Sequence, residues 1–181
     1  MEIVYLNNQF IEQKDARVPV MDRGFLFGDA IYEVIPFFNG VEVGMKEHLE
    51  RLMTSGAKSN MPVRPYSHWE EVIHRLIKKN KISNADFSVY IQVSRGTYPT
   101  RSHAITKQAE TTEVAFCMPL KKVDPSHNHQ AILREDTRHQ LCHIKSTNLF
   151  ANTQLKQIAQ DKKAIECILH RDNQVTEGTC S

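Results

Sequence analysis

The sequence predicts an α+β fold of two lobes, and three observations support this. Residues 87–93 and 114–120 alternate apolar and polar side chains, which is the period of a half-buried strand. Other segments repeat apolar residues at i, i+4, i+7 and i+8, which is typical of helices. A polar stretch that contains Pro125 separates the two parts. We therefore expect an N-terminal α+β lobe at residues 1–120, an interdomain linker at 121–130, and the start of a C-terminal lobe at 131–181.

Composition excludes several classes of protein. With 181 residues, 40% of them hydrophobic, the chain can bury a core of one or two small domains. The net charge of +2 gives no electrostatic footprint for nucleic acid. The N-terminus lacks a basic and apolar leader, and no run of eighteen apolar residues indicates a membrane span. We expect a soluble cytoplasmic protein whose thiols are reduced, since its four cysteines show no C-x-x-C pairing.

The chain opens with a predicted hairpin, with strands at 3–6 and 9–11 around Asn7-Asn8. Residues 22–29 contain two glycines and are expected to form a loop, which matches no phosphate-binding glycine pattern. An apolar strand is predicted at 30–38, followed by the turn Asn39-Gly40.

The first long helix is predicted from Met45, and its apolar stripe includes Leu49. Arg51 stands about 200° from Leu49, on the opposite face of the helix. Periodicity alone favours a solvated arginine paired with Glu47 one turn earlier. The alternative is that this second face lines a cleft. A second amphipathic helix follows, with Ser67 and Glu70 as a predicted capping box and Lys78-Lys79 at its end.

The long connection between the two alternating strands carries Arg101 and His103. Pro99 keeps the residue before it extended and the loop open, and the side chains of Arg101 and His103 would lie on the same side if the chain there is extended. An Arg-x-His pair is a plausible clamp for a carboxylate, because a guanidinium supplies two parallel hydrogen bonds and an imidazole a third. A polar loop tip in water is an equally good interpretation of the residues alone.

Lys145 precedes a helix predicted from the apolar stripe of residues 151–159, with Ser146 or Thr147 as the expected cap. Strands are then expected at 164–170 and 174–177, and Glu177 ends the second. An amine and a distant carboxylate are the two groups that pyridoxal phosphate chemistry needs: one forms a Schiff base, and the other keeps the ring nitrogen protonated. A lone lysine before a helix is usually a solvated surface residue. We expect no metal site, because the histidines and cysteines match no zinc spacing.

Three runs of residues carry a family resemblance. They are Asp-Arg-Gly-Phe-Leu-Phe-Gly-Asp-Ala-Ile-Tyr-Glu at 22–33, Cys-His-Ile-Lys-Ser-Thr-Asn-Leu at 142–149 and Val-Thr-Glu-Gly-Thr-Cys-Ser at 175–181. Together with Arg101-x-His103, these runs resemble the class IV (fold-type IV) pyridoxal-phosphate aminotransferases, and most of all the D-amino-acid (D-alanine) aminotransferases. Branched-chain aminotransferases and aminodeoxychorismate lyase are also similar. The resemblance implies the two-lobed class IV fold, pyridoxal 5'-phosphate as cofactor and a homodimer.

The resemblance also implies roles for individual residues. Lys145 would be catalytic and carry the cofactor as a Schiff base, Glu177 would hold the ring nitrogen, and Arg51 would bind the phosphate. Arg138, which residue reasoning places on the edge of a strand, would approach the cofactor. The substrate carboxylate would be bound by Tyr32, Arg101 and His103.

The function expected from the resemblance is ping-pong transamination of D-alanine and 2-oxoglutarate to pyruvate and D-glutamate. Aminodeoxychorismate lyase and branched-chain aminotransferase are the alternatives, and a non-catalytic α+β binding module with a solvated Lys145 belongs to a different class. Two departures stand out. Cys180 lies where the D-amino-acid enzymes carry a small hydroxyl residue. Chains of the family also continue beyond Ser181, so we expect the C-terminal lobe to be truncated.

Overall fold

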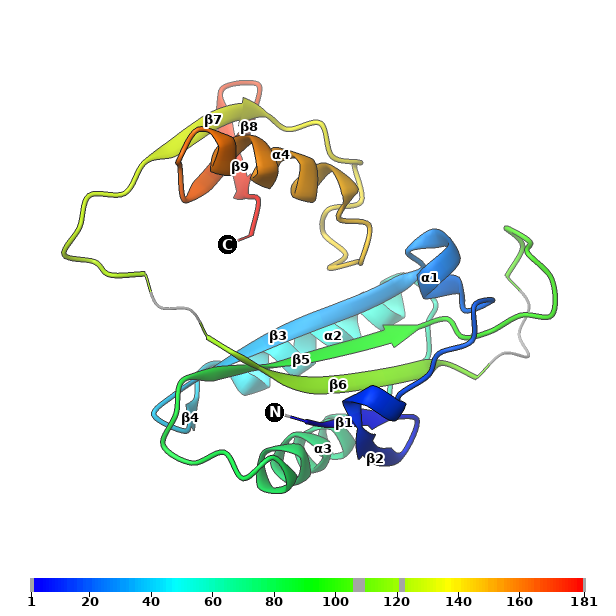
Figure 1. Cartoon of the computed structure of the whole chain (residues 1–181). Coiled ribbons are helices and arrows are strands. Elements are labelled where there is room, and N and C mark those ends of the chain that lie inside the picture. Colours follow the sequence, from blue (N-terminus) through cyan, green and yellow to red (C-terminus); the bar gives the residue numbers. More distant parts are fainter. Residues whose placement is uncertain (1, 106–109, 121–122, 181) are drawn as a thin grey trace. The chain divides into compact units, whose positions relative to one another are not determined.

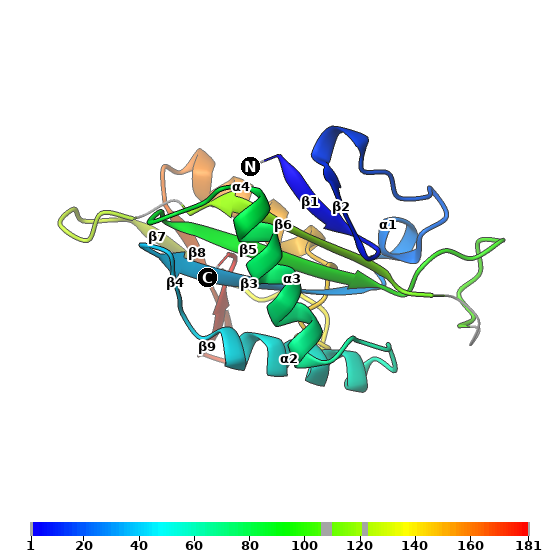
Figure 2. The same ribbon diagram turned by 90° about the horizontal axis from the view of Figure 1, so that it is seen from below.

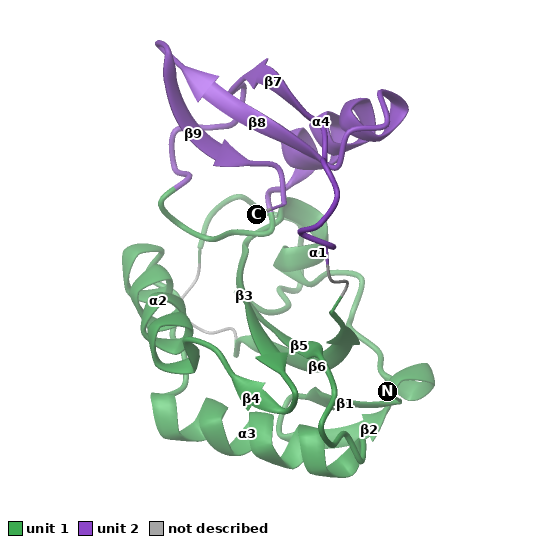
Figure 3. Ribbon diagram, turned by 90° about the vertical axis from the view of Figure 1, so that its left-hand side faces the viewer, with its two compact units in different colours: residues 1–121, 143–147 green, residues 122–142, 148–181 purple. Residues whose placement is uncertain are grey.

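A computed structural model describes residues 2–105, 110–120 and 123–180, and its contacts divide the chain into two compact units. Figure 3 colours unit 1 green and unit 2 purple. Each unit combines at least one helix with a sheet (Figure 1), which confirms the predicted α+β class. The residues of the units are 1–121 with 143–147 for unit 1, and 122–142 with 148–181 for unit 2.

Unit 1 contains a six-stranded sheet in the order β2-β1-β6-β5-β3-β4, counted over the described residues. All its pairings are antiparallel, and β5 and β6, the two strands with the alternating patterns, are neighbours with Tyr90 opposite Phe116. The strands are β1 Ile3–Leu6, β2 Gln9–Glu12, β3 Ala30–Phe38, β4 Val41–Glu42, β5 Phe87–Ser94 and β6 Thr112–Pro119. A 3-10 turn, η1 Gln13–Asp15, follows β2.

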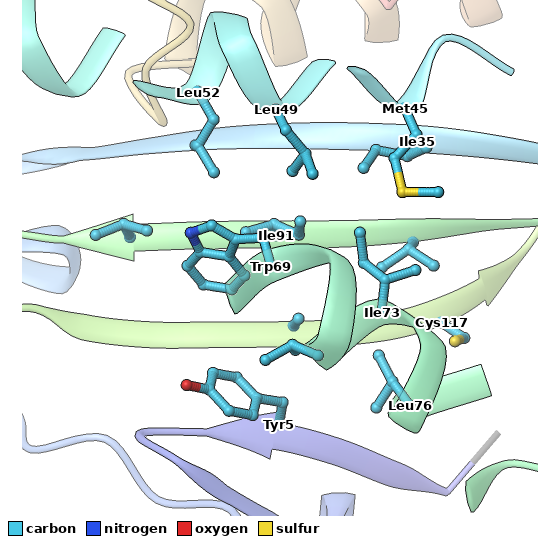
Figure 4. Close-up of a cluster of buried hydrophobic side chains, with 14 of the residues drawn as sticks. Tyr5, Ile35, Met45, Leu49, Leu52, Trp69, Ile73, Leu76, Ile91 and Cys117 are labelled. Atoms are coloured by element: carbon cyan, nitrogen blue, oxygen red, sulfur yellow. The ribbon is translucent and has the colours of Figure 1, made fainter. Parts of the chain in front are cut away.

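Two helices, α2 Met45–Lys58 and α3 Tyr66–Lys79, pack on one face of this sheet, and α3 crosses in front of the strands in Figure 2. Their apolar stripes meet alternate residues of the strands, because successive side chains of a strand point to opposite faces. Trp69 lies at the centre of this core (Figure 4) and has no exposed surface. The core fixes β3, whose residues Ile31, Glu33, Ile35 and Phe37 are buried in alternation.

The loop predicted at 22–29 is wrong, because a short helix, α1 Arg23–Phe27, lies there. Asp22 caps it by accepting a hydrogen bond from the Gly24 amide at 2.8 Å. Gly28 ends it in the left-handed region with φ 65°. Five residues are too few to display a 3.6-residue period, although both end signals were present in the sequence.

The capping box predicted at Ser67 and Glu70 is also wrong. Helix α3 begins at Tyr66, and its N-cap is Pro65, which provides no side-chain cap. Pro65 is extended at this cap, with φ −65° and ψ 163°, a conformation that proline adopts readily, and its missing N–H is not needed there.

Unit 2 has a three-stranded sheet in the order β7-β8-β9, with β7 Ala131–Glu135, β8 Glu166–Arg171 and β9 Gln174–Gly178. Strands β7 and β8 are parallel, and β8 and β9, which correspond to the strands expected at 164–170 and 174–177, form an antiparallel hairpin. Helix α4 Phe150–Asp161 packs on β8 through a small apolar cluster that includes Ala159, Cys167 and Leu169. Its N-cap is Leu149 without a side-chain bond, so the cap predicted at Ser146 or Thr147 is wrong.

Residues 143–147 group with unit 1, although the sequence placed them in the C-terminal lobe. This segment carries Lys145 and belongs by its contacts to unit 1, whereas the residues on either side of it belong to unit 2. The first two linker residues, Lys121 and Lys122, lie outside the described residues. The boundaries at 120 and 130 stay a prediction.

Candidate active site

Lys145 is held by the backbone of β3. The amide of Tyr32 donates to the Lys145 carbonyl at 3.0 Å, and the Thr147 amide donates to the Ala30 carbonyl at 3.0 Å. Between them, Ser146 forms an antiparallel bridge with Ile31. The Thr147 hydroxyl, predicted to cap a helix, donates to the Gly28 carbonyl at 3.1 Å instead. The lysine segment is therefore fixed to the edge of the sheet, before α4 begins at Phe150.

The Lys145 side chain is partly buried and its ammonium contacts an aromatic ring. Nζ lies 4.4 Å from the centroid of the Tyr32 ring. Burial lowers the pKa of Lys145; the charge of Glu33 opposes this change, and the charge of Arg51 adds to it. A lower pKa increases the fraction of neutral amine, the form that attacks carbonyl groups.

Glu33 of β3 connects the sheet to Arg51 of α2. Its side chain has no exposed surface, and it accepts hydrogen bonds from Arg51 Nε at 2.5 Å and Nη2 at 2.7 Å. His48 Nδ1 lies 2.7 Å from the same carboxylate. Burial alone would raise the pKa of Glu33, but the hydrogen bonds and charges of Arg51 and His48 outweigh it and lower the pKa.

The direction of the Arg51 side chain is therefore set by Glu33 of β3, a partner that the helical period of α2 does not reveal. One edge of its guanidinium is held by Glu33, while 52% of its side chain is exposed. Bidentate pairing orients the planar group. A guanidinium oriented in this way and open to solvent is able to bind a dianion, as predicted for the cofactor phosphate, and that role stays a prediction.

Tyr32 lies on the face of β3 opposite Glu33, because the two are neighbours in the strand. Its ring stacks on Tyr90 of β5 with centroids 5.6 Å apart, and Tyr90 stacks on Phe116 of β6 at 4.8 Å. This aromatic row fixes the ring that contacts Lys145. Tyr32 itself is half-buried on β3, and its predicted contact with a substrate carboxylate stays a prediction.

Arg101 and His103 lie around one aromatic ring of α1. The Arg101 guanidinium carbon is 4.9 Å from the centroid of Phe27, and the His103 ring centroid is 5.3 Å from it. Both residues are exposed. The structure thus brings together the two members of the predicted carboxylate clamp, and their binding of a substrate stays a prediction.

Unit 2 pairs Arg138 with Glu177, the two residues that the resemblance assigned to the cofactor ring. Arg138 Nη1 donates to Glu177 Oε2, and only 9% of the Arg138 side chain is exposed. Asp136 holds the guanidinium from the other side through Nε and Nη2, both at 2.9 Å. Hydrogen bonds from Arg138, with one from Thr176, keep the pKa of Asp136 well below its usual range.

The placement of Arg138 on a strand is wrong, because β7 ends at Glu135. The chain turns there because the Asp136 carboxylate also accepts a hydrogen bond from the Arg138 amide at 3.0 Å. Such local bonds from aspartate to backbone compete with the strand ladder.

The predicted residues fall into three groups. Lys145, Tyr32 and Arg51 interact with one another in unit 1, where Arg101 and His103 form a separate pair. Arg138 and Glu177 pair in unit 2. The approach of Glu177 to Lys145 across one cofactor ring stays a prediction.

Sequence reasoning missed three supporting residues: Glu33, His48 and Asp136. Glu33 carried a signal, since it is a lone acid in the apolar run 30–38. Its partners come from another element, so the sequence could not name them. Within the described ranges, no group of three His, Cys, Asp or Glu residues could hold a metal ion, and no helix has the length and hydrophobicity to cross a membrane.

Comparison with known proteins adds the family context. The sequence model of the family "Amino-transferase class IV" matches residues 30–181. A D-alanine aminotransferase of Listeria monocytogenes serotype 1/2a (strain 10403S) is 38% identical over 184 residues, covering 98% of this chain and 63% of the relative. A D-alanine aminotransferase of Staphylococcus epidermidis (strain RP62A) is 36% identical and covers 100% of this chain and 64% of the relative. The chain thus spans a little under two thirds of these relatives.

Solved structures show the same fold. A branched-chain amino acid aminotransferase of Escherichia coli matches with a TM-score of 0.84 at 18% identity, over 98% of this chain and 62% of its own. A hypothetical aminotransferase of Mycobacterium tuberculosis, solved in a form with bound pyridoxal phosphate, matches with a TM-score of 0.78 at 15% identity, over 98% and 65%. At these identities the likeness concerns the fold alone.

Proposed function

Because this chain belongs to the class IV aminotransferases, a family that uses pyridoxal 5'-phosphate, we propose that it serves the transfer of amino groups between D-amino acids and 2-oxo acids. The proposed reaction converts D-alanine and 2-oxoglutarate into pyruvate and D-glutamate. The names of the relatives at 36% to 38% identity support this choice of substrates.

The observation that carries the proposal is the environment of Lys145. A surface lysine would be solvated and fully charged, but this amine is partly buried, contacts the Tyr32 ring at 4.4 Å and has a lowered pKa. Burial combined with a neighbouring cation, here Arg51, is a usual way to activate a lysine. These features favour an enzyme over the non-catalytic binding module.

The residues of unit 1 fit the cofactor in charge and chemistry. Lys145 supplies an amine for an aldehyde, and Arg51, close enough to affect the pKa of Lys145, supplies a half-exposed cation for a phosphate. When bound, pyridoxal phosphate supplies an aldehyde that condenses with amines and an aromatic ring that withdraws electrons from the substrate Cα. In unit 2, Glu177 would serve the ring nitrogen, and Arg138 would hold the Glu177 carboxylate.

Lys145 also has the properties of a base. As a free amine, its neutral Nζ would move a proton between the substrate Cα and the aldehyde carbon of the cofactor. Arg101 and His103 would bind the α-carboxylate, with the Tyr32 hydroxyl as a third partner. Orientation by two or three donors fixes which Cα bond faces the base.

Labelling of Lys145 tests the proposal directly. The protein, produced with pyridoxal phosphate, is treated with borohydride and digested, and the peptides are mapped by mass spectrometry. We expect the cofactor on Lys145 in the wild type, no adduct in Lys145→Ala, and an unchanged adduct in Lys46→Ala, whose lysine is exposed on α2. An unlabelled Lys145 in a folded protein would contradict the proposal.

Substrate assays separate the alternatives. We expect turnover of D-alanine with 2-oxoglutarate to exceed that of L-alanine or L-valine, and no pyruvate from aminodeoxychorismate. Faster turnover of L-valine would favour a branched-chain enzyme, and release of pyruvate from aminodeoxychorismate would favour the lyase.

The proposal also includes a cytoplasmic homodimer. The four free thiols agree with a reducing compartment, and sedimentation would measure the association.

A further inference from the structure

Arg23, the first residue of α1, is a buried arginine outside the predicted cofactor and substrate groups. Only 6% of its side chain is exposed. Nε donates to Asp29 Oδ2 at 2.8 Å, and Asp29 accepts an equivalent bond from Arg95 at 2.8 Å. Burial alone would raise the pKa of Asp29, but the bonds and charges of the two arginines lower it. The guanidinium of Arg23 is therefore anchored on one side.

The other side of this guanidinium binds the loop that carries the predicted carboxylate clamp. Nη1 donates to the carbonyl of Ser102 at 2.5 Å and lies 3.5 Å from that of Ala104. Nη2 donates to the carbonyl of His103 at 3.4 Å. Three consecutive carbonyl groups thus converge on one side chain.

Aromatic contacts complete the arrangement. The Arg23 guanidinium carbon lies 4.8 Å from the centroid of Phe27 and 5.0 Å from that of Tyr98. The same Phe27 ring contacts both Arg101 and His103. Helix α1 therefore holds the backbone of the loop through Arg23 and its side chains through Phe27.

We propose that Arg23 is a positioning residue, which fixes the loop carrying Arg101 and His103 and so determines how strongly substrates with an α-carboxylate are selected. The inference rests on the proposed function, because it takes these two residues as the carboxylate clamp. Lysine could not replace Arg23, since three carbonyl groups and one carboxylate require the planar, multi-donor group of arginine. Arg23, which is buried and bonded to the loop backbone, would act through the loop and not by contacting the substrate.

Kinetics of two variants test the proposal. Arg23→Met removes the donors and keeps an apolar stem, whereas Arg23→Lys keeps the charge and loses the fork. The matched control is Arg75→Met, since Arg75 is an exposed arginine of α3 paired with Glu71. Each variant is assayed with D-alanine and with ethylamine, which is the same molecule without its carboxylate.

We expect the KM for D-alanine to rise on the order of tenfold or more in Arg23→Met, with kcat changed much less, because a misplaced clamp weakens binding and orientation. Reactivity toward ethylamine should stay unchanged, and Arg75→Met should behave as wild type. An equal loss for D-alanine and ethylamine, or an unchanged KM, would overturn the proposal. If Arg23→Met does not fold, a wild-type KM in Arg23→Lys would overturn it equally.

Hydrogen exchange gives a readout that does not need activity. We expect faster amide exchange at residues 101–104 in Arg23→Met than in wild type or Arg75→Met, and unchanged exchange in β5. Unchanged exchange in the loop would show that Arg23 does not fix it. A wild type that lacks both D-alanine turnover and cofactor labelling at Lys145 would defeat the proposed function instead, while the exchange result would still decide the role of Arg23 in the loop.

Discussion

Glu33 is the residue on which the geometry around Lys145 most depends. Its buried carboxylate accepts both hydrogen bonds from one edge of Arg51 and contacts His48, while its charge acts on Lys145. Removing one partner of a buried ion pair leaves the other partner's charge uncompensated. Glu33 holds Arg51, and its negative charge partly offsets the lowering of the Lys145 pKa by burial. Its substitution should therefore alter both groups.

Glu33→Gln keeps the shape of the side chain and removes its charge. We expect a loss of roughly 1–3 kcal/mol of unfolding free energy, measured by urea denaturation. The pKa of Lys145 should fall further, because the negative charge that opposed its depression is gone. The pH dependence of Lys145 acetylation, followed by mass spectrometry, should therefore shift to lower pH. Glu47→Gln, on the exposed face of α2, should leave both measurements unchanged.

Asp136 gives a second prediction, for the acid stability of unit 2. Its pKa is depressed in the folded state, so its carboxylate contributes stability above the unfolded value of about 3.9. That contribution is lost as the pH falls below this value toward the folded pKa. Asp136→Asn should be less stable near pH 7 and should lose less stability between about pH 4 and pH 2. Asp161→Asn, at an exposed site on α4, should follow the wild-type curve.

At the scale of elements, periodicity identified the long segments and failed at short ones. Strands β3, β5 and β6 and helices α2 and α3 bury one face each, so their patterns were legible in the sequence. Helix α1 has five residues, and its role comes from Arg23 and Phe27, which contact a loop about eighty residues away. Partners at such separation are set by tertiary packing, which one sequence does not reveal.

The packing of α1 predicts the sign of a substitution at Gly24. Alanine favours helices over glycine by roughly 1 kcal/mol. A Cβ at Gly24 would, however, lie 2.8 Å from the Ser94 Cβ and 3.0 Å from Asp22 Oδ1. We expect the clash to prevail, so that Gly24→Ala lowers the unfolding free energy by about 1–3 kcal/mol in urea. Phe25 lies on the same helix and is 76% exposed, so Phe25→Ala should change the unfolding free energy by less than about 0.5 kcal/mol.

For the whole molecule, the sequence predicted two parts and most of their elements. It did not predict that the segment containing Lys145 would belong to the first part. The apolar pattern after Lys145 pointed to a helix and its cap, whereas Ser146 and Thr147 bond to β3, more than a hundred residues earlier. Pairing along the edge of a strand uses backbone groups, which have no side-chain signature.

This pairing predicts the behaviour of a nicked chain. Residues 123–130 are exposed and lie in no helix or strand, so a protease should cut there first. We expect the two fragments to co-elute in native size exclusion, because residues 145–147 stay bonded to β3 and Ile144 packs against the main core. They should separate in denaturant. Replacing Thr147 with proline removes one of these bonds and should promote separation; early separation of the wild-type fragments would contradict the expectation.

The edge position of the lysine segment has a further consequence for how the protein is made. A ribosome synthesises β1 to β6 before it reaches residue 143, and N-terminal units generally fold first. Lys145 is therefore synthesised after β3, the strand to whose edge its segment binds. Until then the growing polypeptide has the scaffold but lacks the Lys145 amine, so this amine meets reactive aldehydes only after the strand edge that holds its segment exists.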